Sequence, residues 1–258
     1  IDAGMDHVVA IRTDGTLWAW GSNLSGQLGD GTRDDLPVPT KIGTATNWAS
    51  VDAGRQHTLA TRTDGTLWEW GGTAPRSPTQ VGSGTTWKTV SAGNGTSFAT
   101  RTDGTLWAWG SNHTGQLGDG TTTDRAAPTQ IGGATWRDVA AGDEHTAAIA
   151  SDGSLWTWGS NGFSQLGDGT YTDRLIPTKI GTAASWKSVS AGVYSTIGLR
   201  TDGGSWGWGQ NVFFQTGTGS QFTSTTPAAV GPVHSWRAVA TGLRHTVDFQ
   251  DAAYGHTY

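Results

Sequence analysis

Histidine is the residue type in this sequence whose spacing first suggests chemistry. Four histidines stand at one position of an internal repeat: His7, His57, His145 and His245. A ring of imidazoles could hold a metal ion or move protons. Thr96 and Ser195 occupy the same position in two other repeats, however, and a hydroxyl replaces imidazole as a hydrogen-bond partner but not readily as a zinc ligand. We therefore expect structural hydrogen bonds from these histidines, with no metal and no cofactor.

The carboxylates suggest no catalytic set either. Five aspartates precede glycine in hairpin motifs: Asp14, Asp64, Asp103, Asp152 and Asp202. Asp30 and Asp34 form the kind of pair that could attract calcium, but no ladder of alternating oxygens closes on a glutamate. The two glutamates, Glu69 and Glu144, stand at different repeat positions, so no paired-carboxylate glycosidase is visible. We predict that the protein is not an enzyme and has no catalytic residues.

The composition favours an all-β protein and argues against several classes of function. The 258 residues include 40 glycines, no cysteine and only 14% charged residues, which is typical of many short strands joined by tight turns. A net charge of −5 has the wrong sign for a protein held on nucleic acid by phosphate contacts. No apolar run approaches the roughly 20 residues that span a bilayer, so we expect no membrane insertion. The absence of cysteine excludes a disulfide framework.

A repeat with a period near fifty residues organises the chain. The motif "RTDGTLWAWG" begins at Arg12 and returns with small changes, and the Asp-Gly pairs lie 50, 39, 49 and 50 residues apart. Opening motifs of the type "VSAGVYS" predict six units, namely 1–47, 48–86, 87–135, 136–185, 186–235 and 236–258. A period of this size indicates an array of supersecondary units.

Each unit contains a predicted β-hairpin and one or two further strands. An Asp-Gly pair between alternating apolar runs predicts a type I′ turn, whose two central residues need positive φ. Because so small a sheet cannot bury both faces alone, neighbouring units must stack. We predict one β-propeller domain over 1–258, either six-bladed or part of a seven-bladed ring. An open β-solenoid is the alternative, although its coils usually repeat at a shorter period.

The second unit lacks the "SNxxGQLGDGT" segment that follows the hairpin in other units. The strand motifs on both sides of the deletion survive. The segment is therefore predicted to be a connecting loop that the fold does not need.

All fifteen tryptophans stand at repeat positions, and two of them occur in each "LWAWG" strand. Residues two apart in a strand point to the same face, so Trp18 and Trp20 share one face while Leu17 and Ala19 share the other. Large aromatic side chains dominate the energetics of protein cores, so we predict that they pack between blades. A ring of aromatic platforms for sugars or for a partner is the alternative.

The segment "AGDEHTAAIASDGSLWTWGSNGFSQLGDG" at 141–169 resembles the repeat of the regulator of chromosome condensation family, and similar motifs cover essentially the whole chain, as in bacterial tandem-repeat members. The resemblance implies a seven-bladed β-propeller. Members that exchange nucleotide on the GTPase Ran carry a wedge-like insertion, which the spacings here lack. Secreted propellers that inhibit β-lactamases are similar too, and they bind through aromatic residues in the loops. We expect an extracellular or cell-surface bacterial location rather than a cytoplasmic one.

The residues that differ between units are the candidates for binding, because repeat scaffolds keep their packing residues and place function in loops on one face. The candidates are Met5, Asp6, Arg55, Gln56, Asp143, Glu144, Phe163, Val193, Tyr194, Phe213, Phe214, Leu243 and Arg244. We predict a non-enzymatic scaffold that binds a protein partner through these loops. The four aromatic candidates are its expected apolar anchors.

Two alternative functions stay open from the sequence. The sixth unit has lost its Asp-Gly pair and the tryptophans of its hairpin, so copies of the chain could complete one another's terminal blade as a homo-oligomer. A glycan-directed enzyme or lectin is the other alternative, although no convergent acid-base set supports it.

Overall fold

The computed structural model describes residues 1–231, 236–241 and 246–250, and every regular element among them is a β-strand. The chain forms two compact units. Unit 1 contains residues 1–113 and 123–135, and unit 2 contains residues 114–122 and 136–258.

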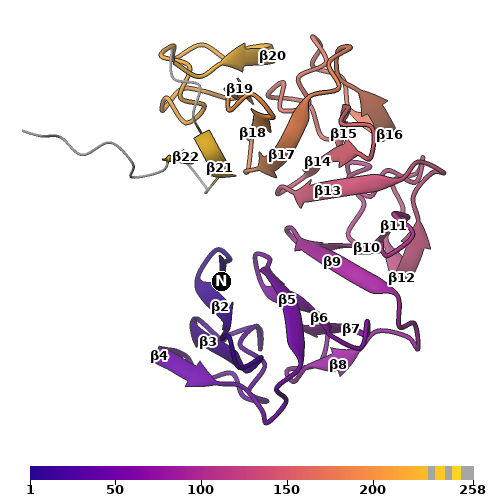
Figure 1. Cartoon of the computed structure of the whole chain (residues 1–258), viewed down its shortest axis with the longest axis vertical. Helices are drawn as coiled ribbons and strands as arrows, with labels where there is room; N and C mark the ends of the chain where they lie inside the picture. The colour runs from indigo at the N-terminus through magenta and orange to yellow at the C-terminus, as the bar shows by residue number, and fades with distance from the viewer. Residues whose placement is uncertain (232–235, 242–245, 251–258) are drawn as a thin grey trace, which may run out of the picture. The chain divides into compact units, whose positions relative to one another are not determined.

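Four-stranded antiparallel sheets, here called blades, make up most of both units (Figure 1). The strands of blades 1 to 3, in unit 1, are β1 (Asp2–Ala3), β2 (His7–Ile11), β3 (Leu17–Gly21) and β4 (Leu36–Lys41); β5 (Trp48–Ala53), β6 (His57–Arg62), β7 (Leu67–Gly71) and β8 (Thr79–Gln80); and β9 (Trp87–Ala92), β10 (Thr96–Arg101), β11 (Leu106–Gly110) and β12 (Arg125–Gln130). The strands of unit 2 are β13 (Trp136–Ala141), β14 (His145–Ala150), β15 (Leu155–Gly159) and β16 (Arg174–Lys179) in blade 4; β17 (Trp186–Ala191), β18 (Ser195–Arg200), β19 (Ser205–Gly209) and β20 (Ser224–Ala229) in blade 5; and the pair β21 (Trp236–Thr241) and β22 (Thr246–Gln250). The predicted all-β repeat fold is confirmed, with four strands in each of the five blades.

Each blade has three kinds of connection, which we name by position. The opening loop joins the first strand to the second, the hairpin turn joins the second to the third, and the long loop joins the third to the fourth. Because the strands are antiparallel, the opening and long loops lie at one end of the sheet and the hairpin turn lies at the other.

The hairpin turn is not of the predicted type I′. Of its Asp-Gly pair only the glycine has positive φ, as in Gly15 with φ 75°. Gly15 N donates to Arg12 O, and Arg12 N donates to Thr16 O. These bonds define a type I turn followed by a left-handed glycine, which is a three-residue hairpin loop with a bulge. The Asp14 carboxylate favours this form because it accepts hydrogen bonds from both the backbone N (3.0 Å) and the hydroxyl (2.6 Å) of Thr16.

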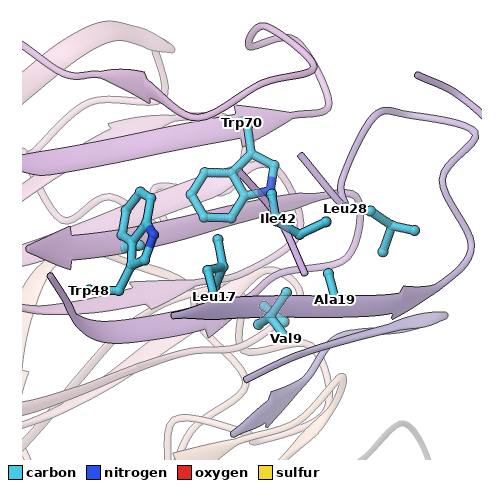
Figure 2. Close-up of a cluster of buried hydrophobic side chains, with 9 residues drawn as sticks. Val9, Leu17, Ala19, Leu28, Ile42, Trp48 and Trp70 are labelled. Atoms are coloured by element: carbon cyan, nitrogen blue, oxygen red, sulfur yellow. The ribbon is translucent and has the colours of Figure 1, made fainter. Parts of the chain in front are cut away.

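The paired tryptophans of blades 2, 3 and 5 pack between blades, as predicted. In unit 1 the face of blade 1 with Leu17 and Ala19 packs against the face of blade 2 with Trp48 and Trp70 (Figure 2). Trp48 and Trp70 meet edge to face, with ring centroids 5.9 Å apart. Similar clusters join blades 2 and 3 in unit 1 and blades 4 and 5 in unit 2. Each blade thus presents its aliphatic face to the tryptophan face of the next blade in the same unit.

Backbone carbonyls in the long loops also link neighbouring blades. Gln27 O, in the long loop of blade 1, accepts hydrogen bonds from Trp70 Nε1 (2.9 Å) and Thr58 Oγ1 (2.8 Å) of blade 2. In unit 2, Gln116 O and Gln165 O accept the equivalent pairs from blades 4 and 5. The segment is a connecting loop, and blade 2 forms its four strands without it, as predicted. Where the loop is present, its carbonyl also satisfies two buried donors of the next blade, which the sequence did not predict.

Blade 2 lacks the loop, and a carboxylate takes the place of the missing carbonyl. Glu69 Oε2 accepts from Trp109 Nε1 and Glu69 Oε1 accepts from Ser97 Oγ, both at 3.0 Å, in blade 3. These two donors are the counterparts of Trp70 and Thr58. Burial raises the pKa of Glu69, while its two hydrogen bonds favour the ionised form. A single side chain thus replaces the deleted segment as a hydrogen-bond acceptor.

Candidate functional site

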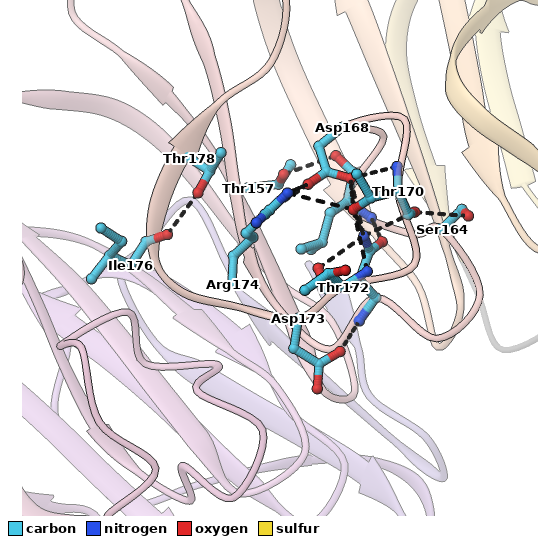
Figure 3. A network of polar contacts seen from close by, with 11 residues as sticks. Thr157, Ser164, Asp168, Thr170, Thr172, Asp173, Arg174, Ile176 and Thr178 are labelled. Atoms are coloured by element: carbon cyan, nitrogen blue, oxygen red, sulfur yellow. Dashed lines mark hydrogen bonds and ion pairs between the residues drawn. The ribbon is translucent and has the colours of Figure 1, made fainter.

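The repeated residues of the long loop build a rigid frame, seen most clearly in blade 4 (Figure 3). Asn161 Oδ1 accepts from Leu166 N (3.1 Å), and its Nδ2 donates to Asp168 Oδ1 (3.1 Å). The same aspartate accepts from the hydroxyl of Thr170 (2.7 Å) and forms an ion pair with Arg174 (2.6 Å). The loop therefore holds its shape through its own polar contacts.

A glutamine in each long loop fixes the variable residue two positions before it. Gln165 Oε1 accepts from Phe163 N at 2.9 Å, and Gln215 Oε1 accepts from Phe213 N at 2.8 Å. The equivalent glutamines of blades 1 and 3 hold Ser25 and Thr114 in the same way. Variable side chains are therefore displayed from a backbone that is already ordered, which lowers the entropy cost of binding.

Hydrogen bonds join the two kinds of variable loop within a blade. Ser160 N, at the start of the long loop of blade 4, donates to Glu144 O in the opening loop (2.9 Å). Gln210 N donates to Tyr194 O in blade 5 (2.8 Å), and Ser22 N donates to Asp6 O in blade 1 (2.7 Å). In each of these blades the two loops are therefore adjacent and joined by a backbone hydrogen bond.

In unit 1 the predicted site residues lie at the tips of the opening loops of blades 1 and 2. Met5, Asp6 and Gln56 are exposed, and Arg55 is half-buried. Leu24, in the long loop of blade 1, is also exposed, although it is not among the predicted site residues.

In unit 2 the structure brings two predicted anchors into contact. The rings of Phe163, from the long loop of blade 4, and Tyr194, from the opening loop of blade 5, have centroids 4.4 Å apart. Phe213 and Phe214 lie in the long loop of blade 5, whose first residue bonds to Tyr194. Glu144 is exposed, and Asp143 and Val193 are half-buried. Leu243 and Arg244 lie outside the described residues.

Phe214 combines exposure with an unfavourable backbone conformation. Its φ is 57°, in the left-handed region that bulky residues rarely adopt, and blades 1 and 3 place Gly26 and Gly115 at this position. Ser164 has a similar φ in blade 4 but is buried, and its hydroxyl donates to Thr170 O. The Phe214 side chain remains 51% exposed and that of Phe213 58% exposed. A strained, exposed aromatic residue is an observation that motivates a functional hypothesis.

The histidines make the structural hydrogen bonds expected of them. His7 Nε2 lies 3.1 Å from Thr58 Oγ1, and His145 Nε2 lies 2.9 Å from Thr196 Oγ1. Because each threonine hydroxyl donates to a loop carbonyl, the imidazole Nε2–H must be the donor. Burial lowers the pKa of His7 to about 4 and that of His145 to about 3, so both rings are neutral at pH 7. His245 lies outside the described residues.

His57, Ser97 and Glu69 form a serine-histidine-carboxylate chain in an order that differs from a catalytic triad. His57 Nε2 lies 3.1 Å from Ser97 Oγ, and Ser97 Oγ donates to Glu69 Oε1. In a triad the histidine stands between the other two residues and accepts the serine proton. Here the serine proton is directed to the carboxylate, and both His57 and Ser97 are buried.

Asp30, the first member of the aspartate pair noted in the sequence, takes part in the hydrogen bonds of the long loop of blade 1. Its Oδ1 accepts from Asn23 Nδ2 (3.0 Å) and Thr32 N (2.9 Å). No group of three or more histidine, aspartate or glutamate side chains is placed to hold a metal ion among the residues that the structure describes. The described part also contains no helix with the length and apolar character needed to cross a membrane.

Comparisons with known proteins identify the repeat. Residues 14–61, 103–149 and 152–199 match a family model described as Regulator of chromosome condensation (RCC1) repeat, and a second model of that description matches 87–116, 136–165 and 186–215. Prp20p of Saccharomyces cerevisiae, a structure reported with its binding to Gsp1p and histones, is 21% identical with a TM-score of 0.84, covering 94% of this chain and 66% of that chain. Yeast RCC1 (Prp20) bound to Kap60 is 20% identical with a TM-score of 0.84, and the match covers 96% of this chain and 65% of that chain. Human WBSCR16 is 20% identical with a TM-score of 0.85, and the match covers 97% of this chain and 71% of that chain.

The chain therefore spans just under two thirds of the length of these yeast chains. At this identity the likeness shows the fold alone, which is a propeller of this family's type.

Proposed function

We propose that this chain, which belongs to the regulator of chromosome condensation (RCC1) repeat family, is a non-enzymatic propeller that binds a protein partner through its opening and long loops. Structures of family relatives with protein partners, such as yeast RCC1 with Kap60, support a binding role.

The observation that carries the proposal is the aromatic surface of blades 4 and 5. Phe163, Phe213 and Phe214 are 41%, 58% and 51% exposed, and Phe163 stacks on Tyr194. Burial of such side chains supplies most of the binding energy in protein interfaces, and residues of this kind serve as anchors. The glutamine-held backbone keeps them in place before the partner arrives.

Several observations support a role without catalysis. Burial lowers the pKa of His57 to about 4, so it is neutral at pH 7, as His7 and His145 are. The aspartates of the hairpin turns are occupied by hydrogen bonds from the residue two positions later, as Asp14 is by Thr16.

The test is a matched pair of triple variants. Phe163→Ala/Phe213→Ala/Phe214→Ala removes the proposed anchors. The control, Tyr171→Ala/Ile176→Ala/Phe222→Ala, removes apolar side chains that are 61%, 59% and 85% exposed but are not candidate site residues. A partner captured from the source organism and purified would be titrated calorimetrically against each. We expect the anchor variant to bind about 30-fold more weakly or worse, and the control to bind like the wild type. Equal losses in both variants, or none in the anchor variant, would contradict the proposal.

A second candidate function is self-assembly, and one observation in unit 1 favours it. The tryptophan face of blade 1 is not covered by another blade of its unit, and Trp20 is half-buried whereas its equivalents Trp70 and Trp109 are buried. A second copy that supplied an aliphatic face could cover this face. Light scattering over a hundredfold concentration range tests this idea, since a constant monomer mass would remove it.

A further inference from the structure

The sequence contains two Asn-Gly pairs, Asn94-Gly95 in the opening loop of blade 3 and Asn161-Gly162 in the long loop of blade 4. In such a pair the backbone N of the glycine can attack the side-chain amide of the asparagine, because no Cβ hinders the approach. Both glycines are exposed. A Cβ built on Gly95 would lie 3.8 Å from Ser111 Cβ, and one built on Gly162 would have no atom within 4 Å. The two pairs are therefore equally open at the glycine.

The amide of Asn161 is held away from its glycine by hydrogen bonds. Asn161 is fully buried, and its Oδ1 accepts from Leu166 N at 3.1 Å. Its Nδ2 donates to Asp168 Oδ1 at 3.1 Å and to Thr170 O at 3.0 Å. The side chain cannot turn toward Gly162 N until several of these bonds break. The fold therefore protects this pair from the attack.

The amide of Asn94 has no such protection. Asn94 is half-buried, and in the part of the chain that the structure describes neither its amide nor Gly95 N makes a hydrogen bond. The loop is anchored on both sides, since Gly93 N donates to Thr96 O (2.8 Å) and Ser111 N donates to Gly95 O (2.9 Å). The backbone is thus held in place while the two groups that would react are left without partners.

We propose that Asn94 is a site of spontaneous deamidation in the folded protein. Gly95 N loses its proton to hydroxide and attacks Asn94 Cγ, so a C–N bond forms, and the amide nitrogen leaves as ammonia. Water then opens the resulting succinimide. Cleavage of the bond between Cγ and Gly95 N gives aspartate, and cleavage of the bond between the Asn94 backbone carbonyl carbon and Gly95 N gives isoaspartate.

The modification places a carboxylate in one of the opening loops. It changes the net charge from −5 to −6, because a neutral amide becomes an acid. Asp143 stands at the equivalent position of blade 4, so an opening loop of this fold accommodates an aspartate there. Isoaspartate in addition lengthens the backbone between Gly93 and Gly95 by a methylene group. Deamidation therefore yields chains that differ in charge and backbone at this loop, whether or not the loops bind a partner.

The experiment incubates the full chain at mildly alkaline pH and compares the two asparagines by mass spectrometry after trypsin digestion. They fall in separate peptides, 89–101 and 138–174, and neither peptide contains another asparagine. We expect the folded chain to be modified at Asn94 at least about tenfold faster than at Asn161, because the Asn161 amide must first break several buried hydrogen bonds. In urea the two rates should become similar, because both pairs are then unfolded.

Asn94→Gln is the matched variant. Its side chain is one methylene longer and does not form the five-membered ring, so peptide 89–101 should stay unmodified while the melting temperature is unchanged. Equal rates at the two asparagines in the folded chain would overturn the proposal. It would also be overturned if peptide 89–101 of the folded wild type stayed unmodified, or if the difference between the two sites persisted in urea.

Discussion

Replacing Glu69 by alanine removes the carboxylate that accepts hydrogen bonds from both Trp109 and Ser97. Both donors are buried, with Trp109 4% exposed and Ser97 1% exposed, so water does not replace the carboxylate without rearrangement. The substitution therefore leaves two buried donors of blade 3 without the acceptor that a long loop in blade 2 would have supplied.

The expected cost follows from the two donors. Each buried donor without an acceptor costs about 1–3 kcal/mol, which sets an upper range of about 2–6 kcal/mol for the pair. Ser97 also lies within hydrogen-bond distance of His57 and can turn its hydroxyl toward that ring, and removing a buried carboxylate relieves its desolvation. We therefore expect a loss of about 3 kcal/mol in the free energy of unfolding, or about 6–12 °C in melting temperature.

Urea titration of Glu69→Ala, Trp109→Phe and the double variant forms a thermodynamic cycle. Because Trp109→Phe removes the donor, the double variant should be less destabilised than the sum of the single variants by about 1–2 kcal/mol. Ala19→Glu is the reciprocal control: it places a carboxylate at the equivalent position of blade 1, where Gln27 O already accepts from Trp70. That variant should be destabilised.

Three results would refute this reasoning. A loss below about 0.5 kcal/mol in Glu69→Ala would mean that the carboxylate does not satisfy the two donors. Strict additivity in the cycle would mean that Glu69 and Trp109 are not coupled, and a stable Ala19→Glu would mean that the carboxylate is not matched to the absence of the loop.

Further predictions concern the pH dependence of stability, strain and loop contacts. Burial lowers the pKa of His57 to about 4 and that of His145 to about 3, so below pH 6.5 these histidines bind protons more tightly in the unfolded chain than in the folded one. Each histidine should therefore lower the free energy of unfolding by about 2 kcal/mol between pH 6.5 and about pH 5. Urea titrations at the two pH values measure this loss. Burial raises the pKa of Glu69 above 4.5, so the folded chain binds the carboxyl proton more tightly than the unfolded chain does. The contribution of Glu69 to stability therefore falls as the pH rises from 4.5 to its folded pKa. Glu69→Gln should lack this pH-dependent contribution. Phe214→Gly should raise the unfolding free energy by about 0.5–1 kcal/mol while weakening partner binding, and unchanged stability by calorimetry would count against strain at this φ. Trp70→Phe should lower the free energy of unfolding by about 2 kcal/mol or more, because it removes one donor from the Gln27 carbonyl and leaves a gap in the core. Trp20→Phe, in the half-exposed face of blade 1, should lower it by less than half as much. Thermal melts of both variants measure the difference.

Much of the fold could be predicted because the same strand and turn motifs recur in several units of the repeat. The alternation in "LWAWG" predicted which residues share a face, and Leu17 and Trp70 indeed lie on opposite sides of one blade interface. Variation among units also located the exposed loop residues, including Phe163 and Phe213. The turn type was missed because Asp-Gly suits both a type I′ turn and the second half of a type I turn with a bulge. The backbone φ angles of the Asp-Gly pair and the hydrogen bonds of Arg12 and Gly15 distinguish them.

Two features of the sequence point to the role of Glu69 as a hydrogen-bond acceptor, but the spacing of the repeat does not connect them. It is the one charged residue at the centre of a "LWxWG" strand, and it stands in the unit from which the glutamine-containing segment after the hairpin is deleted between two intact strand motifs. Connecting the two facts requires knowing that the loop carbonyl and the central strand residue of one blade face the same donors on the next. That knowledge comes from contacts between residues about 30 to 40 positions apart.

The sequence by itself determined the repeat, the strands, the faces on which tryptophan and leucine lie and the loops that vary, because each depends on local periodicity and turn chemistry. Only the tertiary structure decided which donors meet which acceptors between blades and that Phe214 is both strained and exposed. These features depend on distances between residues from different strands and different repeats, and no pattern along the chain encodes a distance across it.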